Sequence, residues 1–252
     1  MTRVTDIHEF IDSFAPFSSA EPWDNVGVLV GDSSAVISKA IVSLDITTDV
    51  LDEAKVSGAQ LVISHHPIIF GGIKNVMVGT PVYKAVSQGI TCLCAHTNLD
   101  KSPVFGVNIC LAETVGLIGC HPSDDNELLF IAETKGDISS RELAETIKKN
   151  LSMSGVCFTD CGKKIHKVGM CSGAGGSEIF SAIDQGCDAF ITGEIKHHEL
   201  LAANSAGMSV FILGHYKSED VVIQPLVDKL SQRFPDVEFV KSKEFSDGVF
   251  LC

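Results

Sequence analysis

Residues 40–66 read AIVSLDITTDVLDEAKVSGAQLVISHH. The stretch opens with a run of aliphatic and β-branched residues and closes with a second such run at 61–63, and both are typical of buried strands. Between them, Thr47 and Thr48 can cap a helix, and Gly58 can end it. Because two strands joined by a helix normally lie parallel, this stretch predicts a sheet with a helix on one face.

The same alternation of short apolar runs and helical periods extends along most of the chain. It predicts an α/β fold of two similar halves, each with three layers: a mostly parallel sheet with helices on its faces. A helix with Pro225 inside it should be kinked near that residue. We expect helices near 4–14, 82–86, 140–151, 179–183 and from 219, and strands near 90–94, 128–131, 156–158, 168–171, 189–192, 209–213 and 237–240.

The polar stretch 119–127 is the best candidate for an internal boundary, because it contains Pro122 and two aspartates between apolar segments. It predicts a first half at 1–125 and a second half at 126–219. We expect the remaining tail, 220–252, to pack back on the first half.

Two pairs of segments are similar to one another in the two halves. Residues 57–64 and 185–192 both place a glycine after a helix and then enter an apolar strand. Residues 93–100 and 212–219 both end a strand with a small residue, a histidine and, four positions later, a carboxylate. The order of these units is the same in both halves, which favours an internal duplication over chance similarity.

The chain has 252 residues, of which 45% are hydrophobic, and this composition is typical of an ordinary globular protein. No apolar stretch approaches the roughly 18 residues that a membrane span needs, and no export signal is evident, so we expect a cytoplasmic protein. The nine cysteines are scattered without a CxxC pair, which favours reduced, mostly buried thiols. A net charge of −13 without a cluster of Lys and Arg argues against general binding to nucleic acids or membranes.

Ionisable residues follow several predicted strands at the point where each strand ends, which is where ligands gather in open α/β sheets. His65 and His66 come directly after 61–63, and neighbouring side chains in extended backbone diverge, which suits two metal ions better than one. His215 and Glu219 are four residues apart and share one face if the chain is helical there.

The unit formed by His96 and Asp100 repeats the spacing of His215 and Glu219 at another strand end. Together these segments predict one site for two metal ions, with candidate ligands in the pairs His65 and His66, His96 and Asp100, and His215 and Glu219. Imidazole and carboxylate donors favour divalent Zn, Mn, Fe, Co or Ni. Two such ions could activate water, which points to hydrolysis.

Two other groups have simpler interpretations. His197 and His198 lie in a predicted polar helix, so we interpret them as surface residues rather than ligands. The glycine-rich run 173–176 could bind an anion, but it lacks a complete phosphate-binding pattern and is better interpreted as the turn that begins a helix.

Five segments resemble the GTP cyclohydrolase I type 2 proteins, also called the Nif-three-like family. Each segment is short, but their order along nearly the whole chain makes the resemblance specific. They are 21–27 (EPWDNVG), 64–67 (SHHP), 95–100 (AHTNLD), 192–194 (TGE) and 214–219 (GHYKSE).

The resemblance implies two similar α/β halves with a dinuclear metal site between them, assembled into a homohexamer. It implies that His66 and Asp100 bind one ion and that His65 and His215 bind the other, with Glu219 bridging both. His96 resembles a neighbouring site residue, and Asp45 is expected to support a ligand. The chain resembles the compact form that lacks an inserted middle domain.

The expected function is that of a metal-dependent hydrolase acting on a nucleotide or a similar small anion, with GTP ring opening implied by the family name. The alternative is a metal-binding adaptor or metal chaperone that acts through protein partners and catalyses nothing. In a third interpretation the metal ions are structural and hold the two halves together.

Overall fold

The computed structural model describes residues 1–246 and 248, and its contacts divide the chain into two compact units. Unit 1 comprises Met1–Ser102 and Ile223–Gly248, and unit 2 comprises Pro103–Val222. Each unit contains one sheet with helices on its faces, so the predicted α/β class with two sheets is confirmed.

Unit 1 is built on a five-stranded sheet in the order β1-β4-β3-β2-β11. Among the described residues, three of its four strand pairs are parallel, and the edge strand β1 pairs with β4 in the antiparallel direction. The predicted parallel sheet is therefore confirmed for this unit. Its strands are β1 (Gly27–Val30), β2 (Lys39–Ser43), β3 (Leu61–Ser64), β4 (Thr91–Cys94) and β11 (Glu238–Lys241).

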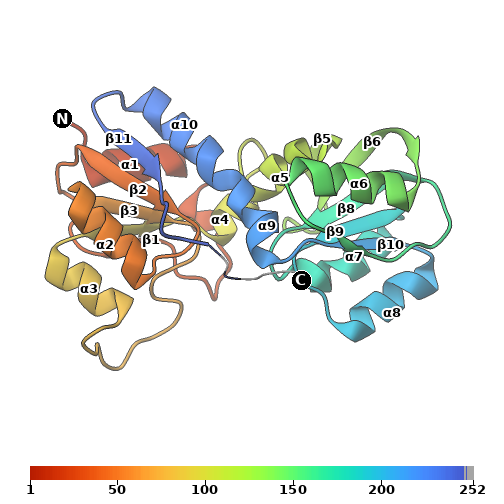
Figure 1. Cartoon of the computed structure of the whole chain (residues 1–252), viewed down its shortest axis with the longest axis horizontal. Helices are drawn as coiled ribbons and strands as arrows, with labels where there is room; N and C mark the ends of the chain where they lie inside the picture. Colours follow the sequence, from red (N-terminus) through yellow and green to blue (C-terminus); the bar gives the residue numbers. More distant parts are fainter. Residues whose placement is uncertain (247, 249–252) are drawn as a thin grey trace. The chain divides into compact units, whose positions relative to one another are not determined.

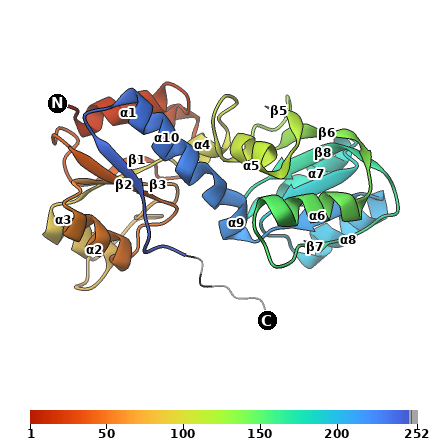
Figure 2. The same ribbon diagram turned by 45° about the horizontal axis from the view of Figure 1, so that its top comes forward.

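Helices cover both faces of this sheet (Figures 1 and 2). Helices α2 and α3 lie on the face where Ile41, Val62 and Cys92 are buried, and α1 and α10 lie on the other face. Strand residues alternate between the faces, so each strand contributes to both layers of core. The helices of unit 1 are α1 (Val4–Asp12), the 3-10 helix η1 (Phe17–Ser19), α2 (Thr48–Ser57), α3 (Pro81–Gln88), α4 (Thr97–Asp100) and α10 (Ile223–Arg233).

Unit 2 contains a six-stranded sheet in the order β5-β6-β8-β9-β10-β7. Three of its five strand pairs within the described residues are antiparallel, so a mostly parallel sheet is wrong for this unit. The seven residues between β5 and β6 are too few for a crossover, which forces that pair to be antiparallel. The strands are β5 (Ile118–Pro122), β6 (Phe130–Ile138), β7 (Cys157–Phe158), β8 (Ile165–Cys171), β9 (Ala189–Thr192) and β10 (Ser209–Ile212).

The core of unit 2 lies in two layers, one on each face of its sheet. Phe130, Met170 and Phe211 pack under α5 and α6, whereas Ile131 and Phe190 pack under α7 and α8. The helices are α5 (Val107–Val115), α6 (Ser140–Asn150), the 3-10 helix η2 (Gly175–Glu178), α7 (Ile179–Asp184), α8 (His197–Ala206), α9 (His215–Glu219) and the 3-10 helix η3 (Asp220–Val222).

The two units divide at 102/103 and 222/223, whereas the sequence places the junction at 119–127. That stretch lies inside unit 2, where β5 pairs with β6. The segment 223–246 belongs to unit 1, through contacts of α10 with β11 and β2. Residues 247 and 249–252 of the predicted tail lie outside the described residues.

Local signals at helix ends agree with the structure. The hydroxyl of Thr47 accepts a hydrogen bond from the backbone N–H of Val50, and Gly58 ends α2 in the left-handed conformation at φ 75°. Ser139, one residue before the predicted cap, makes a capping box with Glu142 at the start of α6.

The predicted C-terminal helix is interrupted rather than continuous. α9, η3 and α10 follow one another, so the tight 3-10 turn lies just before the first turn of α10, which contains Pro225. A proline without an N–H is tolerated in the first turn of a helix, where its donor would find no partner inside the helix. No helix within the described part of the chain combines the length and apolar character that crossing a membrane requires.

Candidate metal centres

The carboxyl ends of three neighbouring strands gather the ionisable residues of unit 1. In the parallel register, Ser43, Ser64 and Cys94 stand side by side at the last positions of β2, β3 and β4. The residues after each strand therefore leave the sheet at the same edge. This brings together Asp45, His65, His66 and His96, which come from segments up to about 50 residues apart.

His65, His66 and His96 form the imidazole cluster of unit 1. Their ring centroids lie 5.0 to 5.5 Å apart, and each ring offers a nitrogen within 4.8 Å of the others. His65 is buried and the other two are largely shielded. Three imidazoles this close form a group that could hold a metal ion.

The Nδ1 atom of each ring in this cluster is held by an oxygen that can only accept a hydrogen bond. Nδ1 of His65 donates to the backbone oxygen of Ala95 at 3.0 Å, and Nδ1 of His66 donates to Oδ1 of Asp45 at 2.9 Å. A neutral ring that donates through Nδ1 carries its lone pair on Nε2, which leaves Nε2 available to bind a metal. Asp45, which the sequence placed near the site, therefore contacts the ring of His66.

His96 is held by Asp24, whose side chain is fully buried. Oδ1 of Asp24 accepts from Nδ1 of His96 at 2.9 Å, and Oδ2 accepts from the hydroxyl and the backbone N–H of Thr97. Burial alone would raise the pKa of Asp24, but the hydrogen bonds from His96 and Thr97 outweigh it and hold that pKa well below its usual range. Asp24 is thus a fixed negative charge behind the imidazole cluster.

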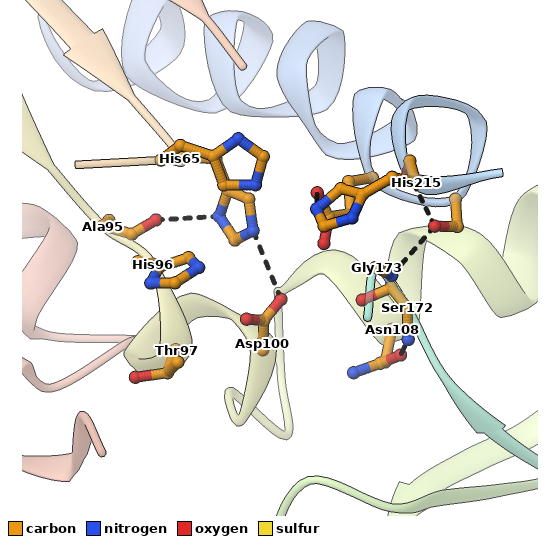
Figure 3. A network of polar contacts seen from close by, with 12 residues as sticks. His65, Ala95, His96, Thr97, Asp100, Asn108, Ser172, Gly173 and His215 are labelled. Carbon is orange, nitrogen blue, oxygen red and sulfur yellow. Dashed lines mark hydrogen bonds and ion pairs between the residues drawn. The ribbon is translucent and has the colours of Figure 1, made fainter. Parts of the chain in front are cut away.

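Asp100 is brought to the same place by the short helix α4, which begins directly after His96. Oδ1 of Asp100 lies 3.5 Å from Nε2 of His65, as Figure 3 shows for these two side chains. An imidazole nitrogen and a carboxylate oxygen at this separation can bind one cation together. Unit 1 therefore brings together three of the predicted site residues and both neighbouring candidates: His65, His66, Asp100, His96 and Asp45.

Unit 2 uses the same arrangement at the carboxyl ends of β8, β9 and β10. Cys171, Thr192 and Ile212 are register partners, so the three following segments leave the sheet together. His215 is the first residue of α9 and Glu219 is the last. Oε2 of Glu219, which is buried, lies 3.1 Å from Nε2 of His215.

The ring of His215 is oriented in the way seen in unit 1. Its Nδ1 donates to Oε1 of Glu194 at 2.8 Å, which places the lone pair on Nε2, next to Glu219. Glu194 lies two residues after the end of β9, and its backbone N–H donates to the carbonyl of Gly173 at 2.8 Å. In His65, His66, His96 and His215 the contact at Nδ1 therefore leaves Nε2 as the nitrogen that could bind a metal.

Glycine is required beside this pair. A Cβ atom on Gly173, whose φ is +58°, would overlap Oε1 of Glu219 and lie 3.3 Å from Nε2 of His215. A Cβ on Gly193 would lie 2.5 Å from the carbonyl oxygen of Gly173 and 2.6 Å from the Ser218 hydroxyl. The hydroxyl of Ser218 accepts from the backbone N–H of Gly173 at 2.9 Å and donates to the carbonyl of His215.

These residues fit divalent ions. The donors are imidazole nitrogens and carboxylate oxygens, the set preferred by Zn, Mn, Fe, Co and Ni in their divalent states. The backbone of Gly173 lies close to the acid and the imidazole that would bind such an ion, and a larger residue would occupy that space. In both units a second layer of hydrogen bonds fixes the rings, as is usual around metal ligands.

The other candidates have structural roles. His197 and His198 are exposed in the first turn of α8, so the surface interpretation is confirmed. The run 173–176 ends in the 3-10 helix η2 and leads into α7, which confirms the predicted start of a helix.

Asp24 and Glu194 hold the rings of His96 and His215, and the sequence pattern at the strand ends did not predict either contact. Each lies in a segment that carries the family resemblance, 21–27 and 192–194, and this was the available signal. Their partners, His96 and His215, could be recognised only once the strands were placed next to one another.

Comparison with known proteins agrees over nearly the whole chain. A family model described as Duf34/NIF3 (NGG1p interacting factor 3) matches residues 2–247. A Campylobacter jejuni protein named GTP cyclohydrolase 1 type 2 homolog is 34% identical, with 90% of this chain and 92% of that protein covered. A Clostridium perfringens protein of the same name is 30% identical, with 97% and 98% covered.

A solved structure also matches. The crystal structure of Staphylococcus aureus protein SA1388 superposes with a TM-score of 0.91 at 27% identity, covering 100% of this chain and 99% of that one. Because the family model spans almost every residue and the curated relatives are covered nearly end to end, this chain belongs to the Duf34/NIF3 family.

Proposed function

We propose that this protein binds two divalent metal ions per chain and uses them to hydrolyse a nucleotide or a similar small anion. The observation that carries the proposal is the common orientation of four histidines. His65, His66 and His215, and also the neighbouring His96, each donate through Nδ1 to an oxygen acceptor, which leaves Nε2 of each ring available. Solvated surface histidines do not need such supports.

In this proposal His65, His66, Asp100, His215 and Glu219 are the ligands of the two ions. The chain passes from unit 1 to unit 2 after Ser102 and returns after Val222. Asp100 and Glu219 therefore lie two and three residues before the two crossings.

We assign His65 and Asp100 to the same ion, because Nε2 of His65 lies 3.5 Å from Oδ1 of Asp100. This differs from the pairing of Asp100 with His66 that the family resemblance implies. Glu219 remains the bridging ligand in the proposal. Five side chains shared by two ions leave positions for water and substrate, as in catalytic rather than structural sites.

Bound divalent ions would lower the pKa of water and polarise a substrate oxygen, which is the chemistry that hydrolysis of a purine ring or a phosphoester needs. The residues of the chain orient and support the ligands. Asp45 and Glu194 fix the rings of His66 and His215, and Asp24 fixes His96. The hydrogen bonds to these carboxylates would raise the basicity of the imidazoles, and the negative charges would offset the positive charge of bound ions. The name of the curated relatives favours GTP as the first substrate to test.

The test begins with elemental analysis of protein purified without chelators or an affinity tag that binds metal, and we expect two ions per chain. Metal-loaded protein is then incubated with GTP and related nucleotides. His65→Ala and Glu219→Ala should abolish turnover. His198→Ala is the matched control, because this histidine is 70% exposed on α8 and should leave turnover unchanged. Equal activity in all four proteins, or none in the wild type with any of the five metals, refutes hydrolysis at this centre.

A second candidate is a metal-dependent adaptor. The family description names an interacting factor, and several apolar side chains are exposed in the loop between β3 and α3. We propose this role as the alternative because apolar surface of this kind is commonly used to bind proteins. It predicts metal-dependent capture of a partner without turnover. The exposed residues are Phe70, Ile73, Val76, Met77 and Val78.

We further propose that the protein acts in the cytoplasm as a homohexamer. The cysteines among the described residues form no disulfide, which suits a reducing compartment.

Native mass spectrometry at micromolar concentration tests the hexamer and should give six times the 26.9 kDa chain mass. If removing metal dissociates the assembly but no turnover is ever found, the ions are structural and the hydrolase proposal fails.

A further inference from the structure

Two large aromatic side chains are exposed beside the imidazole cluster of unit 1. Trp23 is 58% exposed and Phe70 is 61% exposed, and their ring centroids lie 5.9 Å apart. Trp23 is the sole tryptophan of the chain. Exposed tryptophans are uncommon on protein surfaces, and a neighbouring pair of aromatic rings beside polar groups is typical of a binding site.

Both rings contact His96. The centroid of His96 lies 6.2 Å from Trp23 and 6.0 Å from Phe70, with the ring planes steeply inclined in both cases. His96 itself lies within the imidazole cluster, 5.1 Å from His65. The aromatic pair is therefore continuous with the candidate metal centre within unit 1, and not a separate surface feature.

Hydrogen bonds on both sides hold the two aromatic residues in place. Asp24, next to Trp23, is fixed by His96 and Thr97. The side chain of Asn25 donates to the backbone oxygen of Ile69 at 2.6 Å, which ties the segment of Trp23 to the segment of Phe70. The exposed rings are thus presented on fixed backbone, which lowers the entropy cost of binding a ligand.

We propose that Trp23 and Phe70 form a stacking subsite for the planar base of a nucleotide whose reacting part lies at the metal centre. This inference rests on the proposed function and names the substrate class more closely. Any of the bases can stack on an aromatic side chain, because every base has a π face. A neutral stacking contact also suits a chain with a net charge of −13, which offers no general attraction for an anion.

The single tryptophan makes a direct test possible. Metal-loaded and metal-free protein are titrated with guanosine, GMP and GTP while Trp23 fluorescence is measured, with correction for absorbance by the base. Stacking should quench the emission. Ribose 5-phosphate and tripolyphosphate, which carry the charges without the base, should leave it unchanged.

Variants provide the second readout, using calorimetry to measure binding of the same ligands. Trp23→Ala and Phe70→Ala should each weaken binding of guanosine and GMP roughly 5- to 150-fold, the range expected for loss of one stacking partner. Trp23→Phe should restore most of the affinity, since it keeps an aromatic face. Phe180→Ala is the matched control, because Phe180 is 47% exposed in unit 2 and should have no effect.

The outcomes separate this inference from the proposed hydrolase activity. Quenching by guanosine without turnover of any nucleotide supports the stacking subsite and overturns the proposed function. Turnover of GTP with no quenching, and with an unchanged KM in Trp23→Ala, overturns the subsite and leaves the proposed function standing. If Trp23 emission instead follows protein concentration, and Phe70→Ala changes the oligomeric state, the rings contact a second copy of the chain and the inference fails.

Discussion

Replacing Gly173 with alanine should weaken metal binding without unfolding the protein. The added Cβ would lie 3.0 Å from Cδ of Glu219, whereas ordinary contacts begin at 3.4 Å, so Cδ must retreat by at least the 0.4 Å difference. Oε1 overlaps the new methyl group and must move further. Ligands generally need to be held within about 0.5 Å of their working positions.

The size of the effect follows from the role of Glu219 as a ligand. Disturbing even the supporting contacts of a metal ligand typically lowers affinity about 10- to 100-fold, and moving the ligand itself should cost at least as much. The substitution also places alanine at φ +58°, which destabilises the fold by roughly 1–2 kcal/mol. The two contributions are separable, because only the first depends on metal.

Gly186→Ala is the matched control. Gly186 has φ +67° but nothing lies within 4 Å of an added Cβ, so the variant carries the backbone cost alone. Metal affinity is measured by competition with a chromophoric chelator, and thermal unfolding is followed with and without metal. At saturating metal, a 100-fold weaker Kd lowers the stabilisation by roughly 2.7 kcal/mol. Wild-type affinity in a folded Gly173→Ala protein would refute the assignment of Glu219 as a ligand.

Three further predictions concern support of the ligands, pH and the core. Asp45→Ala removes the acceptor that orients His66, and should lower metal affinity about 10- to 100-fold in the same competition assay with little change in stability. Burial raises the pKa of Cys92 to about 12 and that of Cys187 to about 11, whereas unfolded thiols titrate near 9.0. The contribution of these two thiols to the free energy of unfolding should therefore be fully present below pH 9 and be lost as the pH rises toward 11–12, by up to about 1.4 kcal/mol per pH unit for each thiol. Urea unfolding at several pH values measures this slope, and alanine at both positions should flatten it. Ile147→Ala, at a fully buried position in unit 2, should cost about 2–5 kcal/mol by urea unfolding, and a loss under 1 kcal/mol would contradict its place in the core.

Much of the local structure could be predicted because the signals are short in range. The N-cap at Thr47 and the left-handed Gly58 bound α2 as expected. The unit His-x3-acid lies at a short helix in both halves. Backbone propensity and spacing decide these features within a few residues, so they are readable without knowledge of the fold.

Other features were not predictable because they depend on which strands become neighbours. The short edge strands β1 and β5 have no strong alternation of apolar and polar residues. Their antiparallel pairing with β4 and β6 is visible only once the strands are placed in the sheets. The division at 102/103 likewise depends on where α5 packs, and not on the polar composition of 119–127.

The sequence by itself determined the α/β class, the placing of histidines and acids after apolar strands, and the chemistry of the donors. Only the tertiary structure decided the partner of each ring. Asp24 lies 72 residues from His96, and Glu194 lies 21 residues from His215. Parallel strands bring such distant residues to one edge, and hydrogen-bond geometry then fixes which nitrogen of each imidazole is left to bind a metal.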